Sequence, residues 1–262
     1  MAYEFIKVDK KDHLTILTIN RPERMNALHP PASKELDQAF DEFAADPEAW
    51  VAIITGAGER SLSAGNDLKW QAENGVDAVL KGMAEVKGGF AGITARFDLL
   101  KPVICAVNGH ALGGGCEIAL ACDIIIAADH AQFGLPEPRV GLLAGAGGVQ
   151  RLPQRLPWHV AMGLMLTGGR MSAQDALKWG LANEVVPMAD LLPAAERWAE
   201  KIMECAPLAV RGTKEGAMLG QDKPVQDTIR GFPGLITVFT SEDAMEGAIA
   251  FSQKRKPSWK GK

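Results

Sequence analysis

The stretch from Gly109 to Glu117 contains three consecutive glycines, at positions 113 to 115, followed closely by a glutamate. Glycines let the backbone turn tightly and let a ligand approach its N–H groups. The apolar, Ala-rich run from Ile118 to Ala121 predicts a helix, so the glycines would lie at its N-terminus, where amides are unpaired and the dipole is positive. A donor-rich backbone beside a carboxylate suits a reaction that builds negative charge on an oxygen while a proton moves nearby.

Two other loops have similarly distinctive ends. One runs from Ser63 to Lys69, and the other runs from Phe133 to Glu137 and leads into a second group of glycines at 145–148. In open α/β sheets, ligands bind outside the carboxyl ends of the strands. The sequence therefore predicts that these loops and the glycine run converge.

The elements that would position these loops follow from hydrophobic patterning. We predict a hairpin, a helix and buried strands in the first half of the chain, over residues 3–9 and 14–20, 32–45, 50–55, 102–107 and 124–128. Helical patterns separate these strands, which favours repeated βα units, a largely parallel sheet and an α/β fold. Beyond Met171 the strand signals nearly vanish apart from 184–186, and we predict helices over 189–205, 208–219, 224–238 and 241–254. We divide the chain into a core, 1–195, that holds the site, and a helical region, 196–262, that mediates oligomerisation.

The composition limits the class of protein. The chain has 262 residues, of which 47% are hydrophobic and 23% charged, as in ordinary globular proteins. The net charge of −4 argues against a nucleic-acid partner, and no apolar run is long enough to span a bilayer. We expect a cytoplasmic protein without a metal site, because the five histidines have no ligand spacing, and with four buried, reduced cysteines.

Residues 71–94 have no clean period and contain five glycines. Two interpretations have equal weight: mobile helix and loop covering a pocket, or a surface excursion of no special function.

Several motifs, taken in order along the chain, resemble the enoyl-CoA hydratase (crotonase) superfamily. They are Arg21-Pro22, Asn26-Ala27-Leu28, Ser63-Ala64-Gly65-Asn66-Asp67-Leu68, residues 108–117, Phe133-Gly134-Leu135-Pro136-Glu137, Gly147-Gly148 and Arg151-Leu152. The resemblance covers nearly the whole chain and implies a crotonase (ClpP-like) fold of repeated ββα units with a helical C-terminal trimerisation region. Residues 88–91 and the ending Ser258-Trp259-Lys260-Gly261 look closest to the carnitinyl-CoA dehydratase branch.

The resemblance also implies a chemistry. The substrate would be an acyl-CoA thioester, whose carbonyl oxygen is held by the N–H groups of Ala64 and Gly114. Glu117 would activate the water that attacks the β-carbon, and Glu137 would deliver the proton to the α-carbon. No cofactor is implied beyond the CoA of the substrate, and the assembly would be a homotrimer or a dimer of trimers.

CoA contacts are implied at three places. Those matching the family are Arg24, Asn26, Ala27 and Leu28 after the first strand pair, Asn66, Asp67, Leu68 and Lys69 near the adenine, and Phe251 and Lys254, which would reach a neighbouring subunit's ligand. Arg24 and Lys254 are equally well explained as solvated surface charges.

Other readings of these residues stay open. Taken alone, Glu117 is a first-turn acid favoured by the helix dipole, and Glu137 is an ordinary turn carboxylate. The presence of both acids favours a hydratase over an isomerase or a thioester hydrolase on the same scaffold, and over a non-enzymatic acyl-CoA- or RNA-binding member. Leu135 and Asn66 depart from the glutamine and alanine common in the family, with an effect on the acyl group that the sequence does not specify.

Overall fold

The larger of two sheets forms the centre of the protein. A computed structural model describes residues 3–221, 223–229 and 231–262, and the strand order in this sheet is β1-β2-β3-β5-β7-β10. The strands are β1 (Ile6–Lys11), β2 (Leu14–Ile19), β3 (Val51–Gly56), β5 (Val103–Val107), β7 (Ile124–Ala128) and β10 (Glu184–Val186). The β1–β2 pair is antiparallel and the other neighbours are parallel, which confirms the predicted hairpin and largely parallel sheet.

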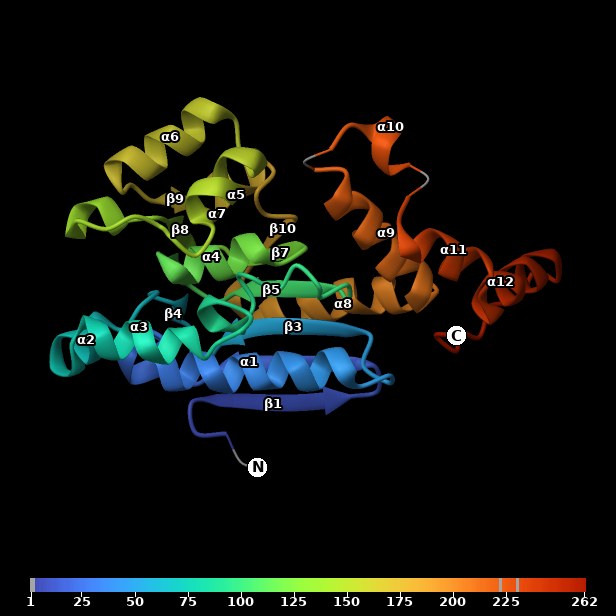
Figure 1. The fold of residues 1–262 in the computed structure, drawn as a ribbon, viewed down its shortest axis with the longest axis horizontal. Helices are drawn as coiled ribbons and strands as arrows, with labels where there is room; N and C mark the ends of the chain where they lie inside the picture. The colour runs from blue at the N-terminus through green and yellow to red at the C-terminus, as the bar shows by residue number, and fades with distance from the viewer. Residues whose placement is uncertain (1–2, 222, 230) are drawn as a thin grey trace.

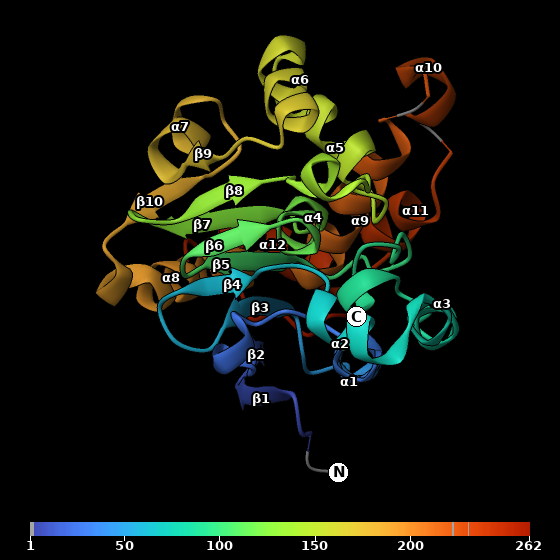
Figure 2. The ribbon, with the colours of Figure 1, turned by 90° about the vertical axis from the view of Figure 1, so that its left-hand side faces the viewer.

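A second, smaller sheet is made of short strands in the order β4-β6-β8-β9. These are β4 (Ser61–Ser63), β6 (His110–Leu112), β8 (Gln132–Gly134) and β9 (Met171–Ser172), and the first three are parallel neighbours (Figure 2). Each of β4, β6 and β8 follows a long strand and precedes helical structure: α2 (Leu68–Asn74), α4 (Gly114–Ala121), or the 3-10 turn η3 (Glu137–Val140) and then α5 (Gly148–Arg155). The ββα repeat is confirmed.

Two long helices pack on the larger sheet. The helix α1 (Pro30–Ala45) begins with prolines that are pre-set for a first helical turn, and it buries Leu36, Phe40 and Phe43. The helix α8 (Leu191–Met203) packs against β3, β5 and β7. The predicted division after residue 195 falls inside α8, and the assignment of the later residues to oligomerisation stays a prediction.

The remaining elements surround this core. They are η1 (Pro22–Arg24), α3 (Val76–Ala84), η2 (Phe90–Gly92), α6 (Trp158–Thr167), α7 (Ala173–Lys178), η4 (Met188–Asp190), α9 (Pro207–Leu219), α10 (Val225–Thr228), α11 (Pro233–Phe239) and α12 (Glu242–Ser252). The single helix predicted over 224–238 is wrong, because Pro233 begins a new helix and holds Phe232 extended at φ −116°, ψ 142°. Residue 230 of that prediction lies outside the described residues.

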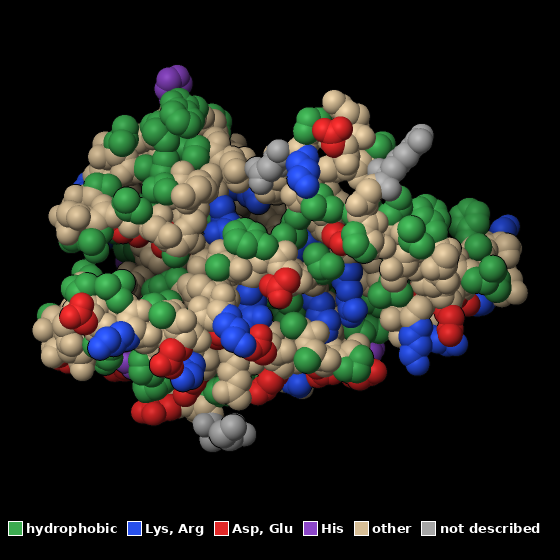
Figure 3. Space-filling model, viewed as in Figure 1, with side chains coloured by type: hydrophobic (Ala, Val, Ile, Leu, Met, Phe, Trp, Pro, Cys, Tyr) green, Lys and Arg blue, Asp and Glu red, His purple; other side chains and the backbone are tan. Residues whose placement is uncertain are grey.

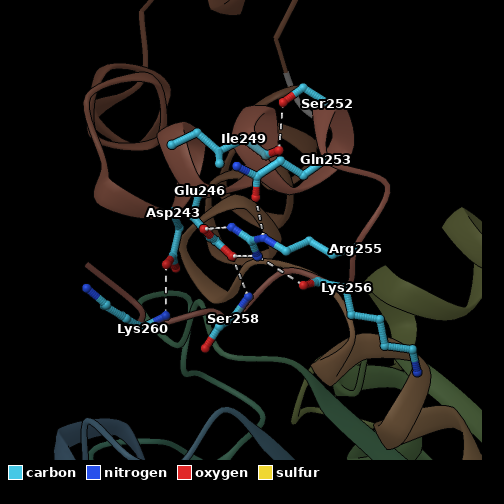
Figure 4. Close-up of polar contacts among 9 residues, drawn as sticks. All are labelled: Asp243, Glu246, Ile249, Ser252, Gln253, Arg255, Lys256, Ser258 and Lys260. Carbon is cyan, nitrogen blue, oxygen red and sulfur yellow. Dashed lines mark hydrogen bonds and ion pairs between the residues drawn. The ribbon is translucent and has the colours of Figure 1, made fainter.

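The C-terminal arm, α10 to α12, projects from the core (Figure 1). Its tail folds back on α12, since Glu246 accepts bonds from both Arg255 Nη1 and Nη2, at 2.7 and 2.9 Å, and from the Ser258 N–H at 2.8 Å (Figure 4). Asp243 accepts the N–H groups of Lys260 and Gly261. These contacts fix the tail against its own helix.

Two expectations from composition are answered by the structure. Among the described residues, no helix combines the length and the apolar character that crossing a bilayer requires. Cys105 and Cys116 are buried free thiols and Cys122 is partly buried, whereas Cys205 is exposed, so the expectation of four buried thiols is wrong for Cys205.

Two helical glycines give a matched test of the packing. A Cβ added at Gly115 in α4 would lie 2.0 Å from the Ser63 carbonyl oxygen, whereas nothing lies within 4 Å of one added at the exposed Gly163 in α6. We expect Gly163→Ala to raise the free energy of unfolding by about 0.5–1 kcal/mol, because alanine favours the helix. Gly115→Ala should lower the melting temperature, and equal shifts of the two variants in a thermal melt would contradict this packing.

Candidate active site

Three loops meet at one cavity. Because β4, β6 and β8 are parallel neighbours, their carboxyl ends share an edge of the small sheet, and the loops leaving them lie side by side. The cavity of about 340 Å³ is lined from these loops and from α2, η2, α4 and η3, by Ala64, Asn66, Leu68, Phe90, Gly113, Gly114, Glu117, Pro136, Glu137, Arg139, Val140, Leu142, Leu143 and Ala146. On the surface, a hollow opens between the regions of α2–α3 and α6 (Figure 3). The predicted convergence of the loops is confirmed.

The Gly114 amide is one free donor at this cavity. Gly114 is the first residue of α4, so its N–H has no acceptor within the helix, and none of the described residues outside it accepts the bond either. The preceding Gly113, at φ 55°, makes the turn from β6 into the helix. The N-terminus of α4 therefore presents an unpaired donor to the cavity, as the glycine run predicted.

The second predicted donor, the Ala64 amide, is not free. Its N–H donates to the carbonyl of Met25 at 3.0 Å and so ties the loop after β4 to the turn after η1. Although Ala64 lines the cavity, its amide is already satisfied. The structure thus corrects the prediction that Ala64 supplies the partner donor to Gly114.

The amide of Asn66 is the unpaired one in this loop. Leu28 donates to the Gly65 carbonyl at 2.8 Å and accepts the Asp67 N–H at 2.9 Å, so Asn66 is the central residue of a parallel bridge. Successive amides along an extended chain point to opposite sides, and the Asn66 N–H therefore points away from Leu28. It has no acceptor among the described residues, while the Asn66 side chain donates to Gln71 Oε1 at 2.6 Å.

Glu117 is buried beneath the cavity. Its Oε1 accepts the N–H of Gly148, the first residue of α5, at 2.9 Å. A Cβ at Gly148 would lie 3.0 Å from the same oxygen, so a glycine permits the close approach. The pKa of Glu117 is raised to about 7, chiefly by burial and in part by the nearby Glu137, while the Gly148 bond opposes the rise.

Glu137 lines the same cavity from the start of η3, directly after Pro136. Its Oε1 lies close to Gly113, where a Cβ would approach it to 3.0 Å. Its Oε2 is buried without a hydrogen-bond partner among the described residues. Burial raises the pKa of Glu137, so both acids hold a proton more readily than an exposed glutamate does.

Several residues predicted to contact CoA have buried side chains instead. Ala27 and Leu28 are buried, and the Asn26 side chain donates to the Ser61 and Ala57 carbonyls at 2.7 and 3.1 Å. Asp67 accepts from Arg21 Nη2 at 2.9 Å and caps α2. These side chains hold the loops together, and none of the four lines the cavity.

The other predicted CoA contacts are exposed. Leu68 lines the cavity. Arg24 and Lys69 are exposed and are not among the residues that line it. Phe251 and Lys254 lie on and just after α12 and do not line the cavity of their own chain. Their contact with a ligand of a neighbouring subunit stays a prediction.

The apolar part of the cavity lining was not predicted from the sequence. Phe90 in η2, together with Val140, Leu142 and Leu143 after β8, gives the cavity an apolar lining. No periodic pattern marks these residues, since they lie in a 3-10 turn and in loops. Leu135, which stands where glutamine is common in the family, is buried and does not line the cavity.

Comparison with known proteins agrees with this geometry. The profile described as enoyl-CoA hydratase/isomerase matches residues 9–262. The chain belongs to the enoyl-CoA hydratase/isomerase family. Within this family, it is 44% identical to a carnitinyl-CoA dehydratase of Salmonella arizonae, over 98% of this chain and 99% of that protein.

Solved structures of family members have the same fold. An enoyl-CoA hydratase of Mycobacterium marinum superposes with a TM-score of 0.91 at 41% identity, covering 98% of this chain and 99% of that one. A carnitinyl-CoA hydratase of Mycobacterium avium has a TM-score of 0.77 at 43% identity, with the same coverage. The expected crotonase fold is therefore confirmed.

The buried acid makes a prediction about stability. A carboxyl with a raised folded-state pKa keeps its proton where the unfolded chain has lost it, so stability falls as pH rises from about 4.5 to about 7. Glu117→Gln removes this loss and keeps an acceptor for Gly148. We expect the variant to gain on the order of 3 kcal/mol relative to wild type across that window in denaturant titrations at several pH values.

The control for this titration is Glu200→Gln, at an exposed position on α8. It should parallel the wild type at every pH. A Glu117→Gln profile parallel to that of the control would show that Glu117 ionises freely.

Proposed function

We propose that this protein catalyses the reversible addition of water across the 2,3 double bond of an enoyl-CoA thioester. The observation that carries the proposal is that Glu117 and Glu137 line one cavity beside two unpaired backbone amides. Membership in the enoyl-CoA hydratase/isomerase family supports it. In the reverse direction, the same groups dehydrate a 3-hydroxyacyl-CoA.

The amides of Asn66 and Gly114 would hold the thioester carbonyl oxygen. Attack of water on the β-carbon moves electrons through the α-carbon to that oxygen, which becomes enolate-like. Fixed backbone donors stabilise such a charge without reorganising, and removing one donor of this kind costs about 2.7–4 kcal/mol in other enzymes.

The two acids would move the protons. Ionised Glu117 removes a proton from water as its oxygen bonds to the β-carbon, and protonated Glu137 gives a proton to the α-carbon. A pKa of about 7 leaves Glu117 a substantial ionised fraction at neutral pH, and burial raises the pKa of Glu137 above that of an exposed glutamate. The single product is the 3-hydroxyacyl thioester, which holds all the atoms of the enoyl thioester and one water. Glu117 ends protonated and Glu137 ionised, and proton exchange with solvent restores both, so the balance needs no redox step.

A specialised hydratase of the carnitinyl-CoA type is the second candidate. The names of the relatives from Salmonella arizonae and Mycobacterium avium favour it. A panel of enoyl-CoA esters that includes crotonobetainyl-CoA separates the two candidates by kcat/KM. Mass analysis of products separates both from an isomerase, which adds no water, and from a hydrolase, which frees CoA.

We also propose that the C-terminal arm packs on further copies of the chain, as a homotrimer or a dimer of trimers. Large apolar side chains are exposed along α10 to α12: Val225, Ile229, Ile236, Phe239, Met245, Ile249 and Phe251. Exposed apolar surface of this extent marks an interaction site. We further propose that the enzyme acts in the cytoplasm, in fatty-acid metabolism.

The acid pair gives the primary test. We expect Glu137→Gln and Glu117→Gln each to lower kcat for hydration of crotonoyl-CoA by about 10²–10⁴, because each loses a proton-transfer group while its volume is kept. Disappearance of the enoyl absorbance measures the rate, and the exposed Glu200→Gln variant is the control. An unchanged rate in Glu137→Gln would rule out the role given to that residue.

The main-chain donors give a second test. Asn66→Ala removes the side chain but keeps the N–H, so the hydration rate should largely survive. Gly114→Ala places a Cβ 2.4 Å from the Phe90 ring and must displace either the ring or the amide, so we expect kcat to fall by about 10²–10³. Equal losses in the two variants would mean that the Asn66 side chain, not its amide, is the donor.

A further inference from the structure

The ring of Phe90 lies directly over Gly114. A Cβ built on Gly114 would lie 2.4 Å from Cε1 and 2.6 Å from Cζ of the ring, so the aromatic ring occupies the space beside the Gly114 Cα. Phe90 also lines the cavity that contains Glu117 and Glu137. The ring is therefore adjacent to the amide proposed to hold the thioester oxygen.

The turn that carries Phe90 is tightly constrained. Ala91 is fully buried at φ 55°, ψ 21°, a left-handed conformation that alanine adopts only when its surroundings enforce it. The flanking Gly89 and Gly92 also have positive φ, at 74° and 65°. A Cβ on Gly92 would lie 2.4 Å from the Asp37 backbone, so the turn is pressed against α1.

A buried ion pair holds the same turn. The Asp37 carboxylate accepts the N–H groups of Lys87 and Gly88 at 3.0 and 2.9 Å and pairs with Arg96 Nη2 at 2.6 Å. Arg96 also donates through Nε to the Gly92 carbonyl at 2.5 Å. The Asp37 and Arg96 side chains are only 8% and 7% exposed, so this clamp is shielded from water.

The neighbouring part of the excursion is different. The helices α2 and α3 contain no buried residue, and on the other side of the cavity Leu142 and Leu143 are 51% and 66% exposed. Beside the buried Gly114 and Glu117, the cavity is thus lined by Phe90 on a turn fixed to α1 and by leucines on exposed chain. Because its turn is held against α1, Phe90 is displaced less easily by a large acyl group than the exposed leucines are.

We propose that Phe90 is a specificity-determining residue that limits the length of the acyl group, with Asp37 and Arg96 as the residues that position it. This inference rests on the proposed function, since it concerns the acyl group of the same thioester. Close packing of the ring on Gly114 limits the space for the acyl chain on that side of the cavity. In hydrophobic pockets, one methylene changes discrimination by about 10–200-fold.

The test compares kcat/KM for crotonoyl-CoA and 2-octenoyl-CoA. In Phe90→Ala, we expect the preference for the short substrate to fall by at least about tenfold, and in Phe90→Trp we expect it to rise. The opposite signs keep the test informative if one variant folds poorly. An unchanged ratio in both variants, or shifts of the same sign, would overturn the proposal.

The positioning residues need a readout that lost stability alone does not move. Arg96→Lys keeps the charge but loses the separate Nε donor to the Gly92 carbonyl, so it should shift the ratio in the direction of Phe90→Ala by a smaller factor. A mere loss of folded enzyme lowers both rates equally and leaves the ratio unchanged, which would remove Arg96 from the proposal. Leu80→Ala, an exposed position on α3 outside the cavity lining, is the control.

Binding measurements separate the failure of this proposal from failure of the proposed function. Butanoyl-CoA and octanoyl-CoA are saturated and cannot be hydrated, so calorimetry gives their Kd ratio without turnover. If the wild type hydrates no enoyl-CoA but Phe90→Ala shifts this Kd ratio toward the long ligand, the proposed hydratase activity is wrong and the proposed role of Phe90 is supported. If hydration is seen and the Kd ratio is unchanged in Phe90→Ala, the proposed role of Phe90 is wrong.

Discussion

The candidate site depends on main chains that approach one another more closely than side chains would permit. Gly115 lies so near β4 that a Cβ would come within 2.0 Å of the Ser63 carbonyl, and a Cβ on Gly65 would lie 2.8 Å from the Gly114 nitrogen. Because β4 and β6 are parallel neighbours, these contacts hold the loop with Asn66 beside the N-terminus of α4. Two donors are thus fixed by backbone packing alone, with no side-chain entropy to lose.

Burial of Glu117 and Glu137 at the carboxyl edge of the small sheet is electrostatically unfavourable. Glu117 has one specific stabilising contact, the Gly148 amide, and Glu137 leaves one oxygen without a partner among the described residues. An ion in such surroundings is unfavourable, so both groups stay closer to neutrality than exposed carboxyls do. That is useful chemically, because a donor and an acceptor of protons must both operate near neutral pH.

Sequence patterning predicted the elements long enough to show a period. The hairpin of β1 and β2 and the helix α1 were expected, whereas β4, β6 and β8 have three residues each, too few for an alternation to be visible. The glutamates and Gly114 do meet at the cavity. The Ala64 donor was wrong because which amide remains free depends on the Met25 carbonyl, a partner supplied by a distant turn. Phe90 had no pattern to mark it.

A motif identifies residues without saying which way their side chains point. Asn26, at φ 54°, donates to the carbonyls of Ala57, before β4, and Ser61, in β4, and accepts the Arg21 N–H. Its place in the motif therefore reflects loop architecture and not contact with a ligand. The chemical groups accordingly belong to the rigid edge of the small sheet, while the lining that meets the acyl group comes from η2 and from the loop after η3. Changes in that lining leave the amides and the acids in place. This separation agrees with the names of two solved relatives that share this fold at over 40% identity, an enoyl-CoA hydratase and a carnitinyl-CoA hydratase.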